Sequence, residues 1–196
     1  NSGSPGDGQI ELCGMQTIVD DTATLHTLAP STEPRWAAKE YGNSGTARAI
    51  SENLVTTALQ DGEARSGVMV DLIIGSQGVG RSYANQLTGL RRNTNTVSLK
   101  GGYEGMTISA PKVGRGKSAT QAYVSDFDAP ARSLFGIHTP SISVAELHDW
   151  DWMDRDGAVL NRVSGTDAYE GTLFAYFDIV CERRNPHWLI ADITES

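Results

Sequence analysis

Four aspartates in one short stretch are the residues of this chain best placed to bind a cation: Asp149, Asp151, Asp154 and Asp156. An EF-hand loop with Asp154 at its third position would begin at Trp152 and end at Val163, where calcium requires a bidentate glutamate. Neither Trp152 at the first position nor Val163 at the last can supply a side-chain oxygen to calcium. The spacing therefore favours an acidic turn between two strands and predicts no calcium site.

Two glycine-rich stretches lie where phosphate-binding loops could be sought. Residues 75–80 follow an apolar run and open a helical pattern, but their glycines do not have the Gly-x-Gly-x-x-Gly spacing of a dinucleotide-binding turn. Residues 116–118 end like a P-loop whose first glycine would fall on Pro111. A strand-to-helix turn and an exposed loop tip explain the two stretches better, so we predict no nucleotide site.

Residues that often catalyse reactions or hold metals are scattered along the chain. None of the four histidines is spaced for metal binding with another histidine or a cysteine. No serine lies in a Gly-x-Ser-x-Gly elbow, and Cys181 lies within an apolar run, where packing explains it better than reactivity. We therefore predict no catalytic residue, no cofactor and no metal, and a protein that is not an enzyme. Two reduced thiols, Cys13 and Cys181, are favoured over a disulfide.

Composition limits the possible classes further. The chain has 196 residues, 39% of them apolar and 20% charged, which predicts one domain or two small lobes with a real core. The net charge of −8 argues against a primary nucleic-acid binder. No apolar run approaches the roughly 18 residues of a membrane span. Residues 1–8 are typical of a linker, and we expect a fragment or a processed product.

Helical spacing first becomes clear over residues 46–60. The apolar residues of this stretch recur every three or four positions: Ala47, Ile50, Leu54, Ala58 and Leu59. Thr46 fits the start of the helix and Gly62 its end. We expect the helix to pack this apolar face on a sheet that contains residues 70–74. A second helix is predicted over residues 79–87, with Gly89 ending it.

The rest of the chain has the pattern of strands. Short apolar runs cut by glycine, proline and asparagine fill residues 94–145, and residues 1–45 contain one or two short strands. The apolar run from Thr172 to Cys181 also fits a helical stripe. Its aromatic and β-branched residues, with Pro186 close behind, favour a strand.

The order of these segments resembles the C-terminal part of a tailed-bacteriophage major capsid protein of the Hong-Kong-97 type. Residues 71–92 are similar to the strand and helix of that family's axial domain, and residues 98–109 to its glycine-paired turn. Residues 120–148 resemble a short hairpin and the chain's return. Residues 152–170 resemble the turn into the peripheral domain, 172–184 its long strand, and 188–193 the return to the axial sheet.

The resemblance implies an α+β fold with a mixed central sheet, flanking helices and an elongated β-rich peripheral extension. It divides the chain into residues 1–45 (peripheral loop and strands), 46–149 (axial domain), 150–187 (peripheral strand region) and 188–196 (return strand). The implied function is that of a structural major capsid protein, or a processed fragment of one, in the icosahedral shell around double-stranded DNA.

The partners implied by the resemblance are other copies, as pentamers and hexamers, with scaffold, portal or decoration proteins. DNA would be touched non-specifically, and no membrane is involved. The location would be the virion, assembled in the host cytoplasm. The family's N-terminal arm, extended loop and spine helix are not visible, so the chain alone is expected to stay a monomer or small oligomer.

Seven residues are implied to touch neighbouring subunits: Trp152, Asp156, Asp167, Tyr169, Glu170, Arg183 and Arg184. The two arginines could clamp a neighbour's carboxylates bidentately, or they could be solvated.

Two other functions compete with the capsid hypothesis. The first is an α/β small-molecule enzyme with a site near Gly75–Gly80. The second is a carbohydrate- or receptor-binding β module that uses exposed aromatic rings, for which the candidates are Trp150, Trp152, Trp188 and Tyr103.

Overall fold

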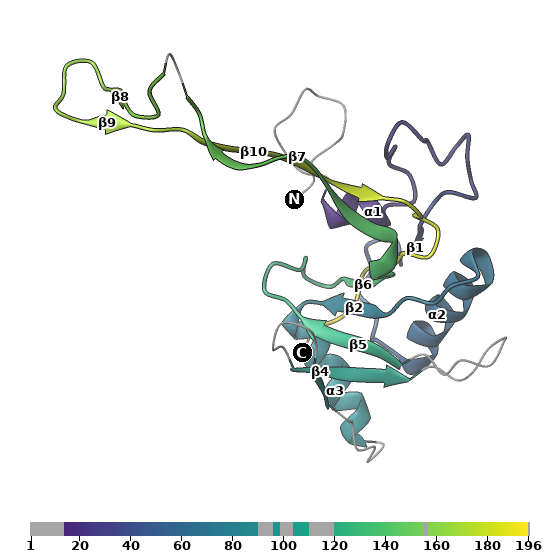
Figure 1. Ribbon diagram of the computed structural model, residues 1–196. Helices are drawn as coiled ribbons and strands as arrows, with labels where there is room; N and C mark the ends of the chain where they lie inside the picture. The colour runs from purple at the N-terminus through teal and green to yellow at the C-terminus, as the bar shows by residue number, and fades with distance from the viewer. Residues whose placement is uncertain (1–13, 90–95, 99–103, 110–119, 155–156, 196) are drawn as a thin grey trace.

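The computed structural model describes residues 14–89, 96–98, 104–109, 120–154 and 157–195, and divides them into a body and a long arm (Figure 1). The fold is mixed α+β. The body contains α1 (Met15–Val19), β1 (Lys39–Tyr41), α2 (Glu52–Ser66), β2 (Leu72–Gly75), α3 (Gln77–Gly89), β3 (Thr96–Ser98), β4 (Glu104–Ser109), β5 (Thr120–Ser125), β6 (Leu134–Ile137) and β11 (Trp188–Ile190). The arm contains β7 (Ile142–Trp152), β8 (Asn161–Arg162), β9 (Tyr169–Glu170) and β10 (Leu173–Cys181).

A seven-stranded mixed sheet forms the centre of the body. Its strand order is β1-β11-β6-β2-β5-β4-β3. The pairs β1–β11 and β2–β5 are parallel, and the other neighbouring pairs are antiparallel. The predicted mixed central sheet with helices beside it is therefore present.

Helices α2 and α3 pack on one face of this sheet. Val55 and Leu59 of α2 and Val79 of α3 join the buried core around Ile73, which is fully buried. Val19 of α1 lies with a second group of apolar side chains from β6 and β11. Full burial of a large apolar side chain stabilises the fold by about 1.5–3 kcal/mol, so these contacts hold the helices and the sheet of the body together.

Helix α2 begins and ends later than predicted. The hydroxyl of Ser51 accepts the N–H of Leu54 at 3.2 Å, and Gly67 ends the helix with a left-handed φ of 73°. Gly62, the predicted end, lies inside the helix, where an added Cβ would be 3.3 Å from the carbonyl oxygen of Pro186 and 3.4 Å from Cδ1 of Trp188. Residues 46–50 instead run beside the C-terminal segment, where Arg48 bridges Ile193. The predicted packing face was nevertheless right, since Ile50 and Ala58 are buried and Leu54 packs against them.

The arm is a two-stranded antiparallel sheet, β7–β10, that extends from the body and carries the small β8–β9 ladder near its far end (Figure 1). The structure confirms a strand, rather than a helix, over residues 173–181. The domain boundary predicted after Asp149 falls at a position inside β7, a strand that pairs with β10 from Ile142 to Trp152 with two register shifts. The arm therefore begins at Ile142. Within the described residues, no helix is long and apolar enough to cross a membrane.

Candidate functional site

The arm exposes more large apolar surface than its own chain can cover. Leu147 is 87% exposed, Val144 66%, Trp150 63% and Trp152 51%. An isolated two-stranded sheet is at best marginally stable in water. Contiguous exposed apolar surface on a protein commonly marks an interface. The arm is therefore the candidate site, and the chemistry it can perform is binding.

One face of the arm carries a group of large apolar side chains. Cross-strand partners share a face, and three pairs place Val144 with Ile179, Glu146 with Phe177, and Trp152 with Leu173. Trp150 joins them, with its ring centroid 6.3 Å from that of Phe177. We call the following set the apolar arm face: Val144, Trp150, Trp152, Leu173, Phe177 and Ile179. A hollow of about 210 Å³ lies on it, lined in part by Trp150 and Phe177.

Two register shifts interrupt the pairing of β7 with β10. They lie on both sides of Tyr176, and each inserts one extra β7 residue. His148 lies opposite Tyr176, with its ring centroid 5.0 Å from that of Phe174. It also lines the hollow beside Val144 and Phe177.

Arg184 lies at the base of the arm and is fully buried. Its guanidinium donates to the carbonyl oxygens of Ile18 at 2.8 Å, Ala23 at 2.6 Å and Thr17 at 2.7 Å, and also to that of Asp20. We call this arrangement the carbonyl cage. The prediction that Arg184 reaches a neighbouring subunit is therefore wrong, because its donors are directed to its own chain.

Arg183 behaves differently from Arg184. It is exposed, and one guanidinium nitrogen donates to the carbonyl oxygen of Ser66 at 2.6 Å, at the C-terminal end of α2. A cation is favourable there because of the helix dipole. Its contact with a neighbour remains a prediction.

Further hydrogen bonds hold the base of the arm against the body. The N–H of His138 donates to Nδ1 of His187 at 3.1 Å, and the N–H of Cys181 donates to Nε2 of His26 at 3.1 Å. His187 is fully buried, and burial, with a smaller effect of His138, lowers its pKa to about 4. The base of the arm is therefore a polar joint with a neutral histidine.

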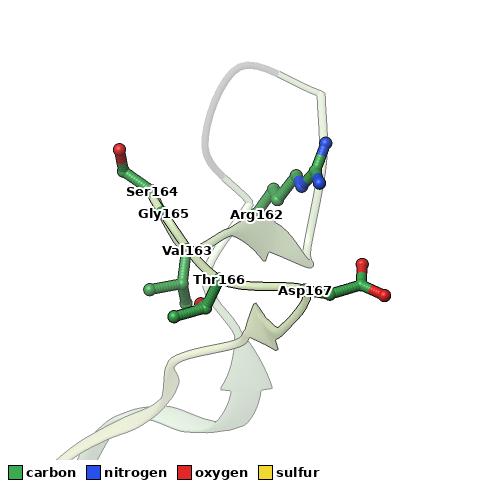
Figure 2. Close-up of a pocket in the computed structure, with 6 residues that line it drawn as sticks. All are labelled: Arg162, Val163, Ser164, Gly165, Thr166 and Asp167. Carbon is green, nitrogen blue, oxygen red and sulfur yellow. The ribbon is translucent and has the colours of Figure 1, made fainter.

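The far end of the arm carries three of the predicted contact residues. Asp167, Tyr169 and Glu170 are exposed, and Tyr169 is 65% exposed. Figure 2 shows the hollow beside them, about 400 Å³ in volume and formed by the single turn of residues 162–167. One turn supplies no opposing wall, so this hollow is part of a surface. Trp152 is on the apolar arm face, and Asp156 lies outside the described residues.

The turn proposed for a small-molecule site is filled by the protein itself. An added Cβ would lie 2.9 Å from Leu134 at Gly75, 2.7 Å from Glu195 at Gly78, and 2.8 Å from Tyr123 at Gly80. These glycines allow the protein's own side chains to pack closely around the turn. Among the described residues, no group of three or more His, Cys, Asp or Glu side chains is arranged to hold a metal ion.

The four aromatic residues considered for sugar stacking do not form one site. Trp188 is fully buried in the core, whereas Trp150 and Trp152 are on the arm. Tyr103 and the loop tip around Lys117 lie outside the described residues, as does Cys13. Cys181 is buried.

Comparison with known structures addresses the fold. No protein-family model and no curated relative matches this sequence. The capsid asymmetric unit of cyanophage A-1(L) matches with a TM-score of 0.54 and 16% identity, over 86% of this chain and 55% of that chain. This chain has a capsid-type fold.

The fold is of the Hong-Kong-97 type, in agreement with the resemblance drawn from the order of segments. The holo-SrpI encapsulin complex of Synechococcus elongatus also matches, with a TM-score of 0.47 and 11% identity, over 91% of this chain and 59% of that chain. The capsid-type chain thus spans a little over half the length of each matched chain.

The alternation of apolar and polar residues indicated strands in the arm, but it did not show that their large apolar side chains are exposed. Leu147 and Trp150 are in a stretch whose apolar and polar residues alternate, which is also typical of a half-buried strand in a sheet. The carbonyl cage was missed because its acceptors are backbone oxygens of residues 17–23, for which side-chain types give no signal.

Proposed function

We propose that this chain is the axial and peripheral part of a major capsid protein that forms the icosahedral shell of a tailed phage. The observation that carries the proposal is the apolar arm face, on which Val144, Trp150 and Trp152 are more than half exposed. A compact body of sheet and helices with one extended arm suits a shell subunit that must bind its neighbours. The capsid-type fold supports the same role.

The physical requirement for assembly is coverage of the arm by other copies. Each large apolar side chain that becomes fully buried contributes about 1.5–3 kcal/mol. Closed symmetric assemblies repeat the same contact in every subunit, so one arm per subunit suffices for rings of five or six. Scaffold, portal or decoration proteins would bind the finished surfaces of such a shell in the virion.

Packaged DNA fits this proposal as a non-specific neighbour. The chain carries a net charge of −8, and phosphates are bound by clustered lysine and arginine. An acidic inner surface would let DNA slide along the shell. Assembly in the host cytoplasm is part of the same proposal.

The test is assembly of the full natural protein with and without the two arm tryptophans. We expect Trp150→Ser with Trp152→Ser to reduce the yield of shells or capsomer rings in negative-stain micrographs by about tenfold or more, equivalent to about 1.4 kcal/mol. The matched control is Phe127→Ser, because Phe127 is 85% exposed in the body and lies outside the arm.

Two results would contradict the proposal. The first is a wild-type protein that stays monomeric in light scattering at all concentrations. The second is normal shells from the double tryptophan variant. The 196-residue chain by itself is expected to remain a monomer or small oligomer in the same measurement.

A further inference from the structure

A basic hollow lies on the body next to the base of the arm. Its volume is about 510 Å³, and it is lined by Pro34, Arg35, Ala37, Arg65 and Asn185. Three separate segments form its wall: the stretch before β1, the C-terminal end of α2, and the link between β10 and β11. Unlike the single turn in Figure 2, this hollow has opposing walls.

Arginines dominate the charge of this hollow. Arg65 is paired with Asp61 at 3.3 Å, and it also donates to the carbonyl oxygen of Ala37 at 3.5 Å. Arg183 adjoins the hollow, since it bonds the carbonyl of Ser66, the residue next to Arg65. Among the described carboxylates, none lies within ion-pair distance of Arg35 or Arg183. These two exposed guanidiniums therefore retain donors for an external anion.

The arm has the opposite charge. Its described carboxylates outnumber its described cations: Glu146, Asp149, Asp151, Asp154, Asp167, Glu170 and Asp178, against Arg162. Near the far end, Asp167 and Glu170 lie on both sides of Tyr169 in the chain, and all three are exposed. Two acidic arms placed side by side would repel each other, so an arm requires a basic receptor.

The far end of the arm and the basic hollow lie toward opposite sides of the molecule. Figure 1 shows the arm projecting away from α2, the helix whose C-terminal end borders the hollow. The far end of the arm therefore meets such a hollow on a different copy. A contact between two different patches is head-to-tail, and head-to-tail contacts close into rings when the rotation allows.

We infer that the Asp167–Glu170 tip of one copy docks into the basic hollow of a second copy. The carboxylates of Asp167 and Glu170 bind Arg35 and Arg183. Arginine suits these contacts, because its planar fork binds carboxylates bidentately. The inference rests on the proposed function and names the surface that receives the arm.

A charge swap on the full natural protein tests this docking. One variant carries Asp167→Lys and Glu170→Lys, a second carries Arg35→Glu and Arg183→Glu, and a third combines all four changes. We expect each double variant to raise the concentration required for assembly by about tenfold or more, and the combined variant to recover to within about threefold of wild type. Asp126→Lys with Asp128→Lys is the control, because it makes the same change in charge at exposed positions of the body, outside both surfaces.

The outcomes separate this inference from the proposed function. Failure of the combined variant to recover, or normal assembly by either double variant, overturns the docking while the wild-type shells still support the capsid role. Absence of assembly by the wild type overturns both. Thermal unfolding checks that each subunit folds, and Arg35→Glu alone replaces the pair if loss of the Arg183 contact with α2 unfolds the body.

Discussion

The backbone N–H of His138 donates to Nδ1 of His187 over 3.1 Å, at the joint where the arm meets the sheet. A nitrogen that accepts a hydrogen bond must be unprotonated, so this bond requires a neutral His187 ring. The ring is fully buried, and burial is the main cause that lowers its pKa to about 4. The His187 ring therefore stays neutral until the pH falls toward 4.

This relationship predicts how stability depends on pH. The unfolded chain binds a proton at His187 near pH 6.5, whereas the folded chain binds it near pH 4. Because the unfolded state binds more protons between these values, the stabilisation is complete above about pH 6.5 and is lost as the pH falls toward 4. The loss is on the order of 3 kcal/mol.

The measurement is urea unfolding at several pH values for wild type and for His187→Asn, which keeps an acceptor but does not titrate. We expect the difference between the two free energies of unfolding to change over this window. His148→Asn, at an exposed position on the arm, is the control. Parallel curves for wild type and His187→Asn would disprove the prediction.

Arg184 and Arg183 are predicted to differ sharply in their effect on folding. Arg184→Ala leaves the buried carbonyls of the carbonyl cage without donors, which lowers the free energy of unfolding by roughly 3 kcal/mol or more. Arg184→Lys also destabilises, because an ammonium cannot reproduce the planar fork. Arg183→Ala removes an exposed contact with a helix end and costs about 1 kcal/mol or less. Urea unfolding of the three variants makes the comparison, and equal losses for the two alanine variants would refute it.

Gly136 is predicted to tolerate no side chain. It pairs with Trp188 across β6 and β11, and a Cβ at this position would overlap the indole ring. Since Trp188 is fully buried, Gly136→Ala should destabilise the body by about 1–3 kcal/mol. The control is Gly42→Ala, where the nearest atom to an added Cβ is Oε1 of Glu40 at 3.7 Å. Thermal unfolding that shows the same midpoint for both variants would contradict the overlap.

Hydrogen exchange is predicted to separate the arm from the body in the isolated chain. Amides of β7 and β10 should exchange faster than those of β2 and β6, because the arm has two strands and little buried apolar cover. The same amides should become protected in assembled shells. Equal protection of β7 and β2 in the isolated chain would show that the arm is stable alone.

Local patterns predicted the elements of the body well and their ends less well. The apolar spacing of Leu54, Ala58 and Leu59 identified the packing face of α2. Thr46 and Ser51 are both suitable caps, and because the helix begins after Ser51, Ile50 lies before it. Gly62 lies close to Trp188, and because this contact joins residues far apart in the sequence, local spacing could not reveal that Gly62 serves packing inside the helix.

The candidate site was harder to predict, for the same reason. Trp152 and Tyr169 were identified through resemblance, and both are exposed on the arm. Arg184 was assigned to a neighbour because two adjacent arginines next to a proline suggest a surface. Its burial depends on four backbone carbonyls brought together by the fold, which no side-chain pattern reports.

The carbonyl cage also has a consequence for how the chain is made. Its bond from Arg184 to Ile18 spans 166 positions, so the segment around α1 leaves the ribosome long before its partner exists. Contacts at such separation carry a large loop-closure cost and form slowly. The base of the arm is therefore expected to fold late in synthesis. The apolar arm face would then form only after the rest of the subunit has folded.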